Sequence, residues 1–338
     1  VQVAMPEATV DLCPIADGGE GTVGALVAGV GGVMFQETVV DPLGEEIAAS
    51  FALLSDGVAV VEMAAASGLT LVPDDLRHPL SLTSLGTGML IKAASAVGDT
   101  TVVGIGSSAT VDGGVGLLQG LGGTVLLKGG VVAPPGLPPS EMMSIESLIP
   151  PPESGELTVL CDVQSPLLGT GGAAAVYGPQ KGATPEEVAI LAANLDHLAS
   201  IAGGGDMPGG GAAGGVGWML GHVLGMTMRP GIDAVLDLLN FDVRVARADL
   251  VITGEGQLDA QTLQGKACMG VAHRAQKHGV RSIAIAGRAG RGWESMVTTH
   301  GGPLTAAAFL SEVVGDERAI SEPEASVIEA VDALLKLV

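Results

Sequence analysis

Acidic side chains stand among glycines near the start of the chain. Residues 16–22 read ADGGEGT and contain Asp17 and Glu20. Glycine lets a ligand approach the backbone closely, and a nearby carboxylate can then bind a metal ion or a hydroxyl group. The same residues also fit a helix start, where Asp17 would accept hydrogen bonds from backbone N–H groups. Both interpretations remain open, and the first makes Asp17, Gly18, Gly19 and Glu20 candidate site residues.

A second glycine-rich segment, residues 104–114, follows a predicted strand and precedes a predicted helix. Its sequence, GIGSSATVDGG, combines hydroxyl groups with backbone N–H groups at a helix start. Such a segment suits a phosphate or another anion, because partial positive charge gathers at helix N-termini. It also matches the dinucleotide pattern GxGxx[GA], but the ribose-binding acid expected about 20 residues later is missing. An ordinary structural turn is the alternative. The candidate binding residues are Gly106, Ser107, Ser108, Thr110, Asp112 and Gly113.

The third segment begins at Asp162, directly after the predicted strand 157–161. Ligands of open α/β sheets bind at the carboxyl ends of strands, so Asp162 is a candidate catalytic residue. Further along, Lys181 lies in the turn 178–182, GPQKG, where it could neutralise a phosphate or a carboxylate as a point charge. A solvated loop lysine is the alternative for Lys181.

The fourth segment, residues 253–266, follows the predicted strand 249–253 and reads TGEGQLDAQTLQGK. Two carboxylates four residues apart meet a hydroxyl group and a lysine at one strand-to-helix junction. Carboxylates can bind Mg²⁺, and lysine can contact the oxygens of a phosphate during its transfer. Helix caps and an i,i+4 surface pair are the alternative. The candidates are Gly254, Glu255, Gly256, Asp259, Thr262 and Lys266, with Glu255 and Asp259 as the candidate magnesium ligands.

The standard motifs of several enzyme classes are missing from the sequence. GxxxxGK[ST] does not occur, which excludes a P-loop enzyme, and the HRD and DFG motifs of protein kinases do not occur either. There is no GxSxG hydrolase motif and no HExxH zinc motif.

Strands and helices alternate along most of the chain, which is typical of α/β proteins. The opening region differs, because three short β-like runs separated by PLG and SDG turns predict antiparallel hairpins. We therefore expect a discontinuous α/β domain with hairpins, residues 1–72 and 288–338, and an α/β domain, residues 73–287, that carries most of the glycine-rich loops. The predicted strands are 37–40, 48–54, 58–63, 100–105, 157–161, 249–253 and 282–286. The predicted helices are 83–97, 113–121, 261–278 and one that begins near Thr184. Residues 129–139 and 150–155 are predicted surface loops.

Composition narrows the class of protein. A chain of 338 residues that is 47% hydrophobic and 15% charged can bury a large core, as two domains. A formal charge of −22 disfavours binding to nucleic acids or anionic membranes. The three cysteines form no CxxC motif, and no signal peptide is evident, so a reduced cytoplasmic protein is expected. Residues 207–228 carry no charged side chain but are rich in glycine, which predicts a buried loop and helix rather than a membrane span.

Taken together, the glycine-rich segments resemble the bacterial glycerate kinase family (type I, glycerate 2-kinase-like). The matching segments occur in the family's order and cover nearly the whole chain. They are PIADGGEGT (14–22), EMAAASGL (62–69), SLGTG (84–88), SAT (108–110), DGG (112–114), CDV (161–163), GPQKGA (178–183), PGID (230–233) and GEG (254–256), followed by Asp259, QT (261–262) and GK (265–266).

The resemblance implies a kinase that transfers the γ-phosphate of ATP to D-glycerate. The usual product is 2-phosphoglycerate, and 3-phosphoglycerate is the alternative product. It also implies two α/β domains around a cleft, one flavodoxin-like with a parallel sheet and the other with mixed or antiparallel strands. We expect glycerate to bind in the cleft, with its carboxylate near Ser107 and Ser108. Asp17 or Asp162 would orient or deprotonate the attacking hydroxyl group.

The remaining expected roles concern ATP. Glu255 and Asp259 would position Mg²⁺ on the phosphates, and Lys266 and Lys181 would offset the negative charge. ATP, Mg²⁺ and D-glycerate are thus the expected cofactors and partners.

The sequence departs from the family pattern at its start. Family members usually begin with a strand and an APDSFKGS-like segment before the region matching Pro14, and this sequence starts at Val1 without them. A misassigned start or a fragment would explain the difference. Ser107 also stands where the family often has glycine. Two alternative functions remain open: a truncated relative that binds its ligand without turnover, and an NAD-dependent oxidoreductase based on residues 104–109.

Overall fold

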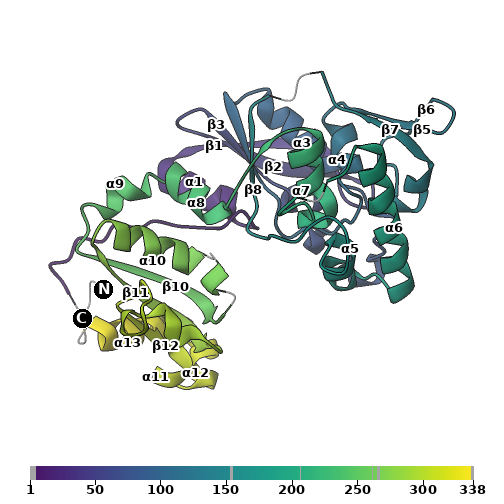
Figure 1. Ribbon diagram of the computed structural model, residues 1–338. Coiled ribbons are helices and arrows are strands. Elements are labelled where there is room, and N and C mark those ends of the chain that lie inside the picture. The colour runs from purple at the N-terminus through teal and green to yellow at the C-terminus, as the bar shows by residue number, and fades with distance from the viewer. Residues whose placement is uncertain (1–4, 153–154, 206, 261, 265–266, 336–338) are drawn as a thin grey trace. The chain divides into compact units, whose positions relative to one another are not determined.

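The chain folds into two compact units (Figure 1). Unit 1 comprises Val1–Ile15 and Ile232–Val338, and unit 2 comprises Ala16–Gly231. The computed structural model describes residues 5–152, 155–205, 207–260, 262–264 and 267–335.

Unit 2 is built on a six-stranded mixed sheet in the order β1-β2-β3-β4-β8-β9. Its first three strands are antiparallel, whereas β3, β4, β8 and β9 run parallel. Because Val58 of β3 pairs with Thr100 of β4, the hairpin strands share a sheet with the middle of the chain. The observed division therefore differs from the boundaries expected near residues 72 and 288. The strands are β1 (Gly32–Val40), β2 (Glu46–Leu54), β3 (Val58–Glu62), β4 (Thr100–Gly104), β8 (Leu157–Leu160) and β9 (Thr227–Arg229).

The three antiparallel strands predicted for the opening region are confirmed. The first hairpin is closed by Asp41, whose carboxylate accepts hydrogen bonds from the N–H groups of Leu43 (2.8 Å) and Glu45 (3.0 Å). At the second hairpin, Gly57 adopts a φ of 89°, which a residue with a side chain rarely adopts.

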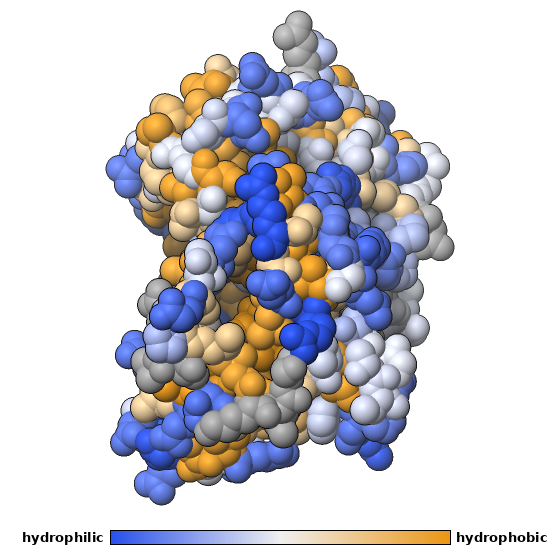
Figure 2. Space-filling model, turned by 90° about the vertical axis from the view of Figure 1, so that its left-hand side faces the viewer, coloured by the Kyte–Doolittle hydropathy of each residue, from blue (hydrophilic) through white to orange (hydrophobic). Residues whose placement is uncertain are grey.

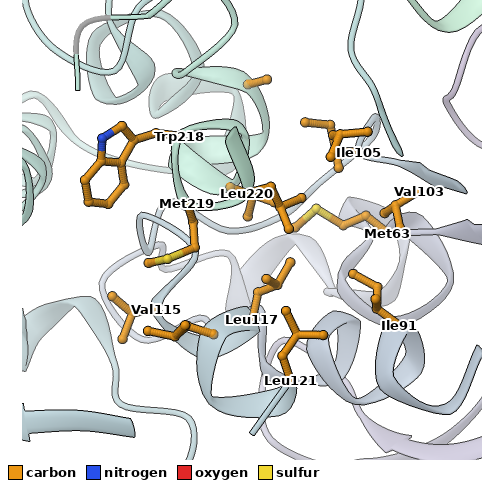
Figure 3. Close-up of a cluster of buried hydrophobic side chains, with 14 of the residues drawn as sticks. Met63, Ile91, Val103, Ile105, Val115, Leu117, Leu121, Trp218, Met219 and Leu220 are labelled. Carbon is orange, nitrogen blue, oxygen red and sulfur yellow. The ribbon is translucent and has the colours of Figure 1, made fainter. Parts of the chain in front are cut away.

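One large apolar core joins the sheet of unit 2 to its helices (Figure 3). Met63, Leu117 and Trp218 are fully buried in it. The predicted helix start at Thr184 is also confirmed as a capping box with Glu187. The helices are α1 (Thr22–Val30), α2 (Ala64–Ser67), α3 (Leu85–Ser95), α4 (Val115–Gly120), α5 (Ala173–Tyr177), α6 (Pro185–Ile201) and α7 (Val216–Trp218).

Unit 2 also contains a small antiparallel sheet, in the order β6-β5-β7. Its middle strand β5 (Thr124–Leu127) pairs with β6 (Val131–Val132) and β7 (Ile145–Ile149). A short strand therefore lies inside the segment 129–139 that the prolines predicted as a loop, because two β-branched residues pair with β5.

The glycine-rich segment 207–228 forms short helical turns rather than one long helix. In the part of the chain that the structure describes, no helix is long and apolar enough to cross a membrane. Hydrophilic residues are interspersed with hydrophobic ones on the face shown in Figure 2.

Unit 1 has a wholly parallel sheet in the order β10-β11-β12, covered by helices on both faces (Figure 1). Side chains of β11 alternate between the faces: Ile283 and Ile285 pack with α13, and Ala284 and Ala286 pack with α10. The strands are β10 (Leu250–Leu258), β11 (Arg281–Ala289) and β12 (Ala306–Phe309). The helices are α8 (Gly231–Leu238), α9 (Phe241–Val245), α10 (Ala267–Lys277), α11 (Leu310–Val313), α12 (Asp316–Ser321) and α13 (Pro323–Leu335).

Candidate active site

Glycines bring two loops of unit 2 into direct backbone contact. The N–H group of Gly106 donates to the carbonyl of Gly18 at 3.3 Å. A Cβ atom built on Gly104 would lie 2.3 Å from that carbonyl oxygen, and one built on Gly106 would lie 2.8 Å from the Cα atom of Gly19. These glycines therefore allow the chain to contact itself. They leave no room at this contact for a pyrophosphate, which removes the basis of the NAD interpretation.

Asp17 and Ser107 approach the same point beside Gly19. A Cβ atom built on Gly19 would lie 3.5 Å from Asp17 Oδ1 and 3.9 Å from Ser107 Oγ. Ser107 is exposed and Asp17 is half-buried. No described residue donates a hydrogen bond to the Asp17 carboxylate. A hydrogen-bond acceptor and a hydroxyl donor are thus presented together across a residue that has no side chain.

The backbone around Ser107 is held by residues 67–69, at the end of α2. Ser107 has a φ of 59°, in the left-handed region that residues other than glycine seldom occupy. Its carbonyl accepts from the N–H group of Leu69 at 2.9 Å, and the N–H group of Ala109 donates to Ser67 at 2.9 Å. Hydrogen bonds on both sides therefore hold Ser107 in this conformation.

Lys181 lies beneath this loop and is only 3% exposed, so the alternative of a solvated loop lysine is wrong. Its Nζ atom donates to Ser108 Oγ and to the Thr110 carbonyl oxygen, both at 2.8 Å. Burial lowers the pKa of Lys181 to about 7, and the negative charge of Asp112 opposes that shift. Lys181 therefore supports the loop from inside the fold.

Asp112, a candidate binding residue, is fully buried and holds the start of α4. Its carboxylate accepts hydrogen bonds from Ser84 N (2.8 Å), Ser84 Oγ (2.7 Å), Gly114 N (3.0 Å) and Gly116 N (3.2 Å). Gly113 packs against apolar side chains of α6. Asp112 and Gly113 therefore contribute to the packing of the fold, because the Asp112 carboxylate accepts its hydrogen bonds from buried groups of the chain.

Glu62 supports a loop of the candidate site, a role that the sequence did not indicate. Its carboxylate accepts from the N–H groups of Gly21 (3.1 Å) and Val23 (2.5 Å), and so caps α1 and fixes the loop containing Gly18 and Gly19. The proposed capping role of Asp17 is therefore wrong, because β3 supplies the cap. A helix cap supplied by a strand about 40 residues away cannot be recognised from the residues next to the helix. Glu62 does, however, begin segment 62–69, which resembles the glycerate kinase family. Glu20 is exposed on the same loop.

Asp162 stands directly after β8, as predicted from the sequence. Its Oδ1 atom accepts from the N–H group of Gly231 at 2.7 Å. A Cβ atom built on Gly231 would lie 1.9 Å from the Asp17 carbonyl oxygen and 2.9 Å from Asp162 Oδ2. Unit 2 therefore brings Asp17 and Asp162 together at one glycine, beside the loop that carries Ser107 and Ser108.

The candidates of unit 1 form a separate cluster around Thr262, which is fully buried. The Thr262 hydroxyl donates to Glu255 Oε1 at 2.5 Å and accepts from the Asp259 N–H group at 3.2 Å. The Gln257 amide donates to Asp259 Oδ2 at 2.9 Å. These bonds fix both carboxylates at the carboxyl end of the parallel sheet. Lys266, the remaining candidate, lies outside the described residues.

Gly254 and Gly256 lie within β10 rather than in a loop. The strand continues to Leu258, beyond the end predicted at residue 253, because Glu255 keeps the parallel register with Ala286 of β11. A Cβ atom on Gly254 would lie 2.2 Å from a carbonyl oxygen of β11, so this glycine permits close strand packing.

The acidic pair of unit 1 fits Mg²⁺ bound to phosphate. Among the described residues, no group of three or more His, Cys, Asp or Glu side chains could hold a metal ion. Mg²⁺ prefers oxygen ligands and is usually bound by one or two carboxylates together with substrate phosphates and water. Glu255 and Asp259 match that pattern rather than a site made by protein alone.

Two arginines at the carboxyl end of β11 are further candidates that the sequence analysis did not include. Arg288 pairs in register with Gln257, and the Arg291 carbonyl accepts from the Ala260 N–H group at 3.0 Å. Both side chains are exposed, and no carboxylate of the described residues forms an ion pair with either of them. The pattern GRAGRG after a predicted strand was the available sequence signal.

Comparison with protein-family models places the whole chain in one family. The model described as the glycerate kinase family matches residues 1–338. The chain belongs to the glycerate kinase family.

Relatives of known name support the same assignment within the glycerate kinase family. A glycerate kinase of Bacillus subtilis (strain 168) is 46% identical over 299 residues, which cover 85% of this chain and 78% of the relative. A glycerate 2-kinase of Escherichia coli (strain K12) is 42% identical over 293 residues, covering 83% and 77%. A crystal structure described as glycerate kinase 2 from Salmonella typhimurium LT2 superposes with a TM-score of 0.83 at 37% identity, over 99% of this chain and 91% of that one. The protein is thus an enzyme of the glycerate kinase family with a mixed α/β fold.

Proposed function

We propose that the protein transfers the γ-phosphate of ATP to D-glycerate and that 2-phosphoglycerate is the product. Membership of the glycerate kinase family supports the reaction class. The observation that supports the residue assignment is the approach of Asp17 Oδ1 and Ser107 Oγ to one point beside Gly19.

An α-hydroxy acid matches this arrangement, because its carboxylate and its hydroxyl group lie on neighbouring carbons. Ser107 and Ser108 would donate hydrogen bonds to the carboxylate. Asp17 would accept the hydrogen of the attacking hydroxyl, since no described residue donates to its carboxylate. Asp162 already accepts from Gly231, so it orients the backbone beside Asp17 rather than taking the proton.

The cluster of unit 1 would serve the ATP phosphates. Glu255 and Asp259 would hold Mg²⁺, which neutralises the charge that develops on the phosphate oxygens during transfer. Arg288 and Arg291 would offset the remaining charge of the triphosphate, since each is an exposed cation without an acidic partner in the described chain. The residues of both units then act by positioning and electrostatics.

A coupled assay of ADP release with D-glycerate and Mg²⁺–ATP tests the proposal, and ³¹P NMR of the product distinguishes 2-phosphoglycerate from 3-phosphoglycerate. We expect turnover by the wild-type protein and a loss of about 10²-fold or more in kcat for Asp17→Asn. Asp75→Asn, an exposed acid of the same unit, is the matched control and should retain full activity. Absence of ADP release from the wild-type protein would overturn the function. Full activity of Asp17→Asn would overturn the role of Asp17 alone.

A further inference from the structure

The hydrogen-bond partners of Lys181 are both neutral. Its Nζ atom contacts only the hydroxyl oxygen of Ser108 and the carbonyl oxygen of Thr110 among the described residues. A neutral amine has two N–H groups, and two acceptors satisfy it fully. A charged ammonium has three, so it would bury one positive charge without an anionic hydrogen-bond partner.

The ionisable groups around Lys181 do not supply that partner. Asp112 is the one whose charge acts on Lys181, and its carboxylate already accepts four hydrogen bonds. The other groups on neighbouring segments are engaged as well: Arg77 pairs with Asp74, Tyr177 bonds to Ser165, and Glu187 closes the capping box with Thr184. A charged Lys181 would therefore lack an anionic partner among these groups, and a bound anion could take that place.

Ser108 connects Lys181 to the exposed loop. An ammonium group can only donate, so Ser108 Oγ must accept from a charged Lys181. The hydroxyl hydrogen of Ser108 is then left to donate elsewhere, and no described residue accepts it. Next to it, Ser107 is exposed and is fixed with a φ of 59°. A ligand carboxylate at this loop would accept from both hydroxyl groups.

We propose that Lys181 is a positioning residue for the anion site at Ser107 and Ser108, and that binding of a substrate carboxylate there draws one proton from solvent onto the Lys181 amine. The inference rests on the proposed function and adds to it a coupling between substrate binding and protonation. The proton comes from the buffer and remains on Nζ while the ligand is bound, so no other reactant is needed.

The coupling has a definite sign. Burial lowers the pKa of Lys181 to about 7 in the ligand-free protein, so the amine is mostly neutral at pH 8 and mostly charged at pH 6. An anion bound close by raises that pKa. Proton uptake on binding should therefore approach one per ligand at pH 8 and fall toward zero at pH 6. Affinity for D-glycerate should weaken by up to about tenfold per pH unit above 7.

Isothermal titration of the full chain with D-glycerate, in two buffers of different ionisation enthalpy at each pH, measures the uptake directly. Lys181→Met replaces the amine by an apolar side chain of similar length and should abolish the pH-dependent uptake. Lys181→Arg keeps a permanent charge and should also show none, while it binds more tightly than Lys181→Met. Lys128→Met, the same change at an exposed lysine, should retain the wild-type uptake.

The outcomes separate this inference from the function on which it rests. Unchanged uptake in Lys181→Met, or equal uptake by the wild-type protein at pH 6 and 8, would overturn the coupling while ADP release still supported the kinase. Absence of D-glycerate binding and turnover in the wild-type protein would overturn both. A purely structural role of Lys181 would lower the free energy of unfolding in Lys181→Met but leave the proton count unchanged.

Discussion

The two candidate clusters of this protein are held in opposite ways. In unit 2, the two loops that carry Asp17 and Ser107 rest on buried polar groups: Lys181 is 3% exposed, Glu62 is 9% exposed and Asp112 is fully buried. In unit 1, Glu255 and Asp259 lie half-buried at the end of a parallel sheet, and only Thr262 behind them is fully buried. One site is built into the core, whereas the other lies at the edge of a sheet.

The difference shows what each site can do. A loop supported by buried hydrogen bonds keeps its donors fixed before the ligand arrives, which suits recognition of a small carboxylate. In unit 1, exposed arginine side chains can instead adjust to a flexible triphosphate, and two half-buried carboxylates suit a metal ion that also binds phosphate and water. Changes to the buried groups that support the loops of unit 2 should therefore act first on stability, and changes to the half-buried carboxylates of unit 1 should act first on catalysis.

The largest effect is expected for Asp112→Ala. Removing its carboxylate leaves the buried donors of Ser84, Gly114 and Gly116 without an acceptor, at a cost of about 1–3 kcal/mol for each unsatisfied group. Ser84 supplies two of these donors, so we expect a loss of at least about 4 kcal/mol in the free energy of unfolding of unit 2. Urea unfolding followed by Trp218 fluorescence in a Trp293→Phe background measures it, because the chain has two tryptophans and Trp218 lies in unit 2.

Asp259→Ala is the control for that comparison. Asp259 is half-buried, and the Gln257 amide that donates to its carboxylate is exposed, so water can replace this bond and the removal should cost about 1 kcal/mol or less in unit 1. Equal destabilisation by Asp112→Ala and Asp259→Ala would show that the two sites are not built differently.

Glu255→Gln should lower catalysis more than stability, the opposite of what we expect for Asp112→Ala. The amide keeps the shape of the side chain and a weaker bond to Thr262, but it loses the charge that would hold Mg²⁺. We expect kcat to fall about 10²-fold, with the free energy of unfolding changed by no more than about 1 kcal/mol. Steady-state kinetics and urea unfolding on the same preparation check both values. A large loss of stability with normal kcat would place Glu255 among the structural residues.

The paired variant Arg288→Ala/Arg291→Ala should weaken the interaction with ATP while leaving that with D-glycerate unchanged. Each lost charge contact to phosphate at an exposed site is worth about 1 kcal/mol, so KM for ATP should rise about tenfold or more. Arg281→Gln at the amino end of the same strand is the matched control, because it lies at the opposite edge of the sheet. An equal rise in KM for ATP with Arg281→Gln would indicate a general effect of net charge.

Sequence alone predicted those parts of the fold that depend on local patterns. The hairpin strands, the Thr184 helix start and Asp162 after its strand were predictable because turn residues, caps and strand ends leave signals within a few positions. The cap that Glu62 gives to α1 was not, since Glu62 lies 41 residues from Gly21, and neither was the bond between Asp112 and Ser84, which lie 28 residues apart. The continuation of β10 through Gly254 and Gly256 depends on pairing with β11, which no local pattern of this segment encodes.

Ser107→Gly gives the smallest expected change in stability and tests the loop itself. Ser107 has a φ of 59°, so glycine would remove about 1 kcal/mol of backbone strain, offset in part by the greater freedom of glycine in the unfolded chain. We expect the free energy of unfolding of unit 2 to change by less than about 1 kcal/mol. The lost hydroxyl should raise KM for D-glycerate about tenfold, as expected for the loss of about 1.5 kcal/mol from one hydrogen bond to a charged group, with KM for ATP unchanged. Ser107→Ala keeps the strain but lacks the hydroxyl, so the two variants separate the two effects. A normal KM for D-glycerate in both would show that the Ser107 hydroxyl does not contact the substrate.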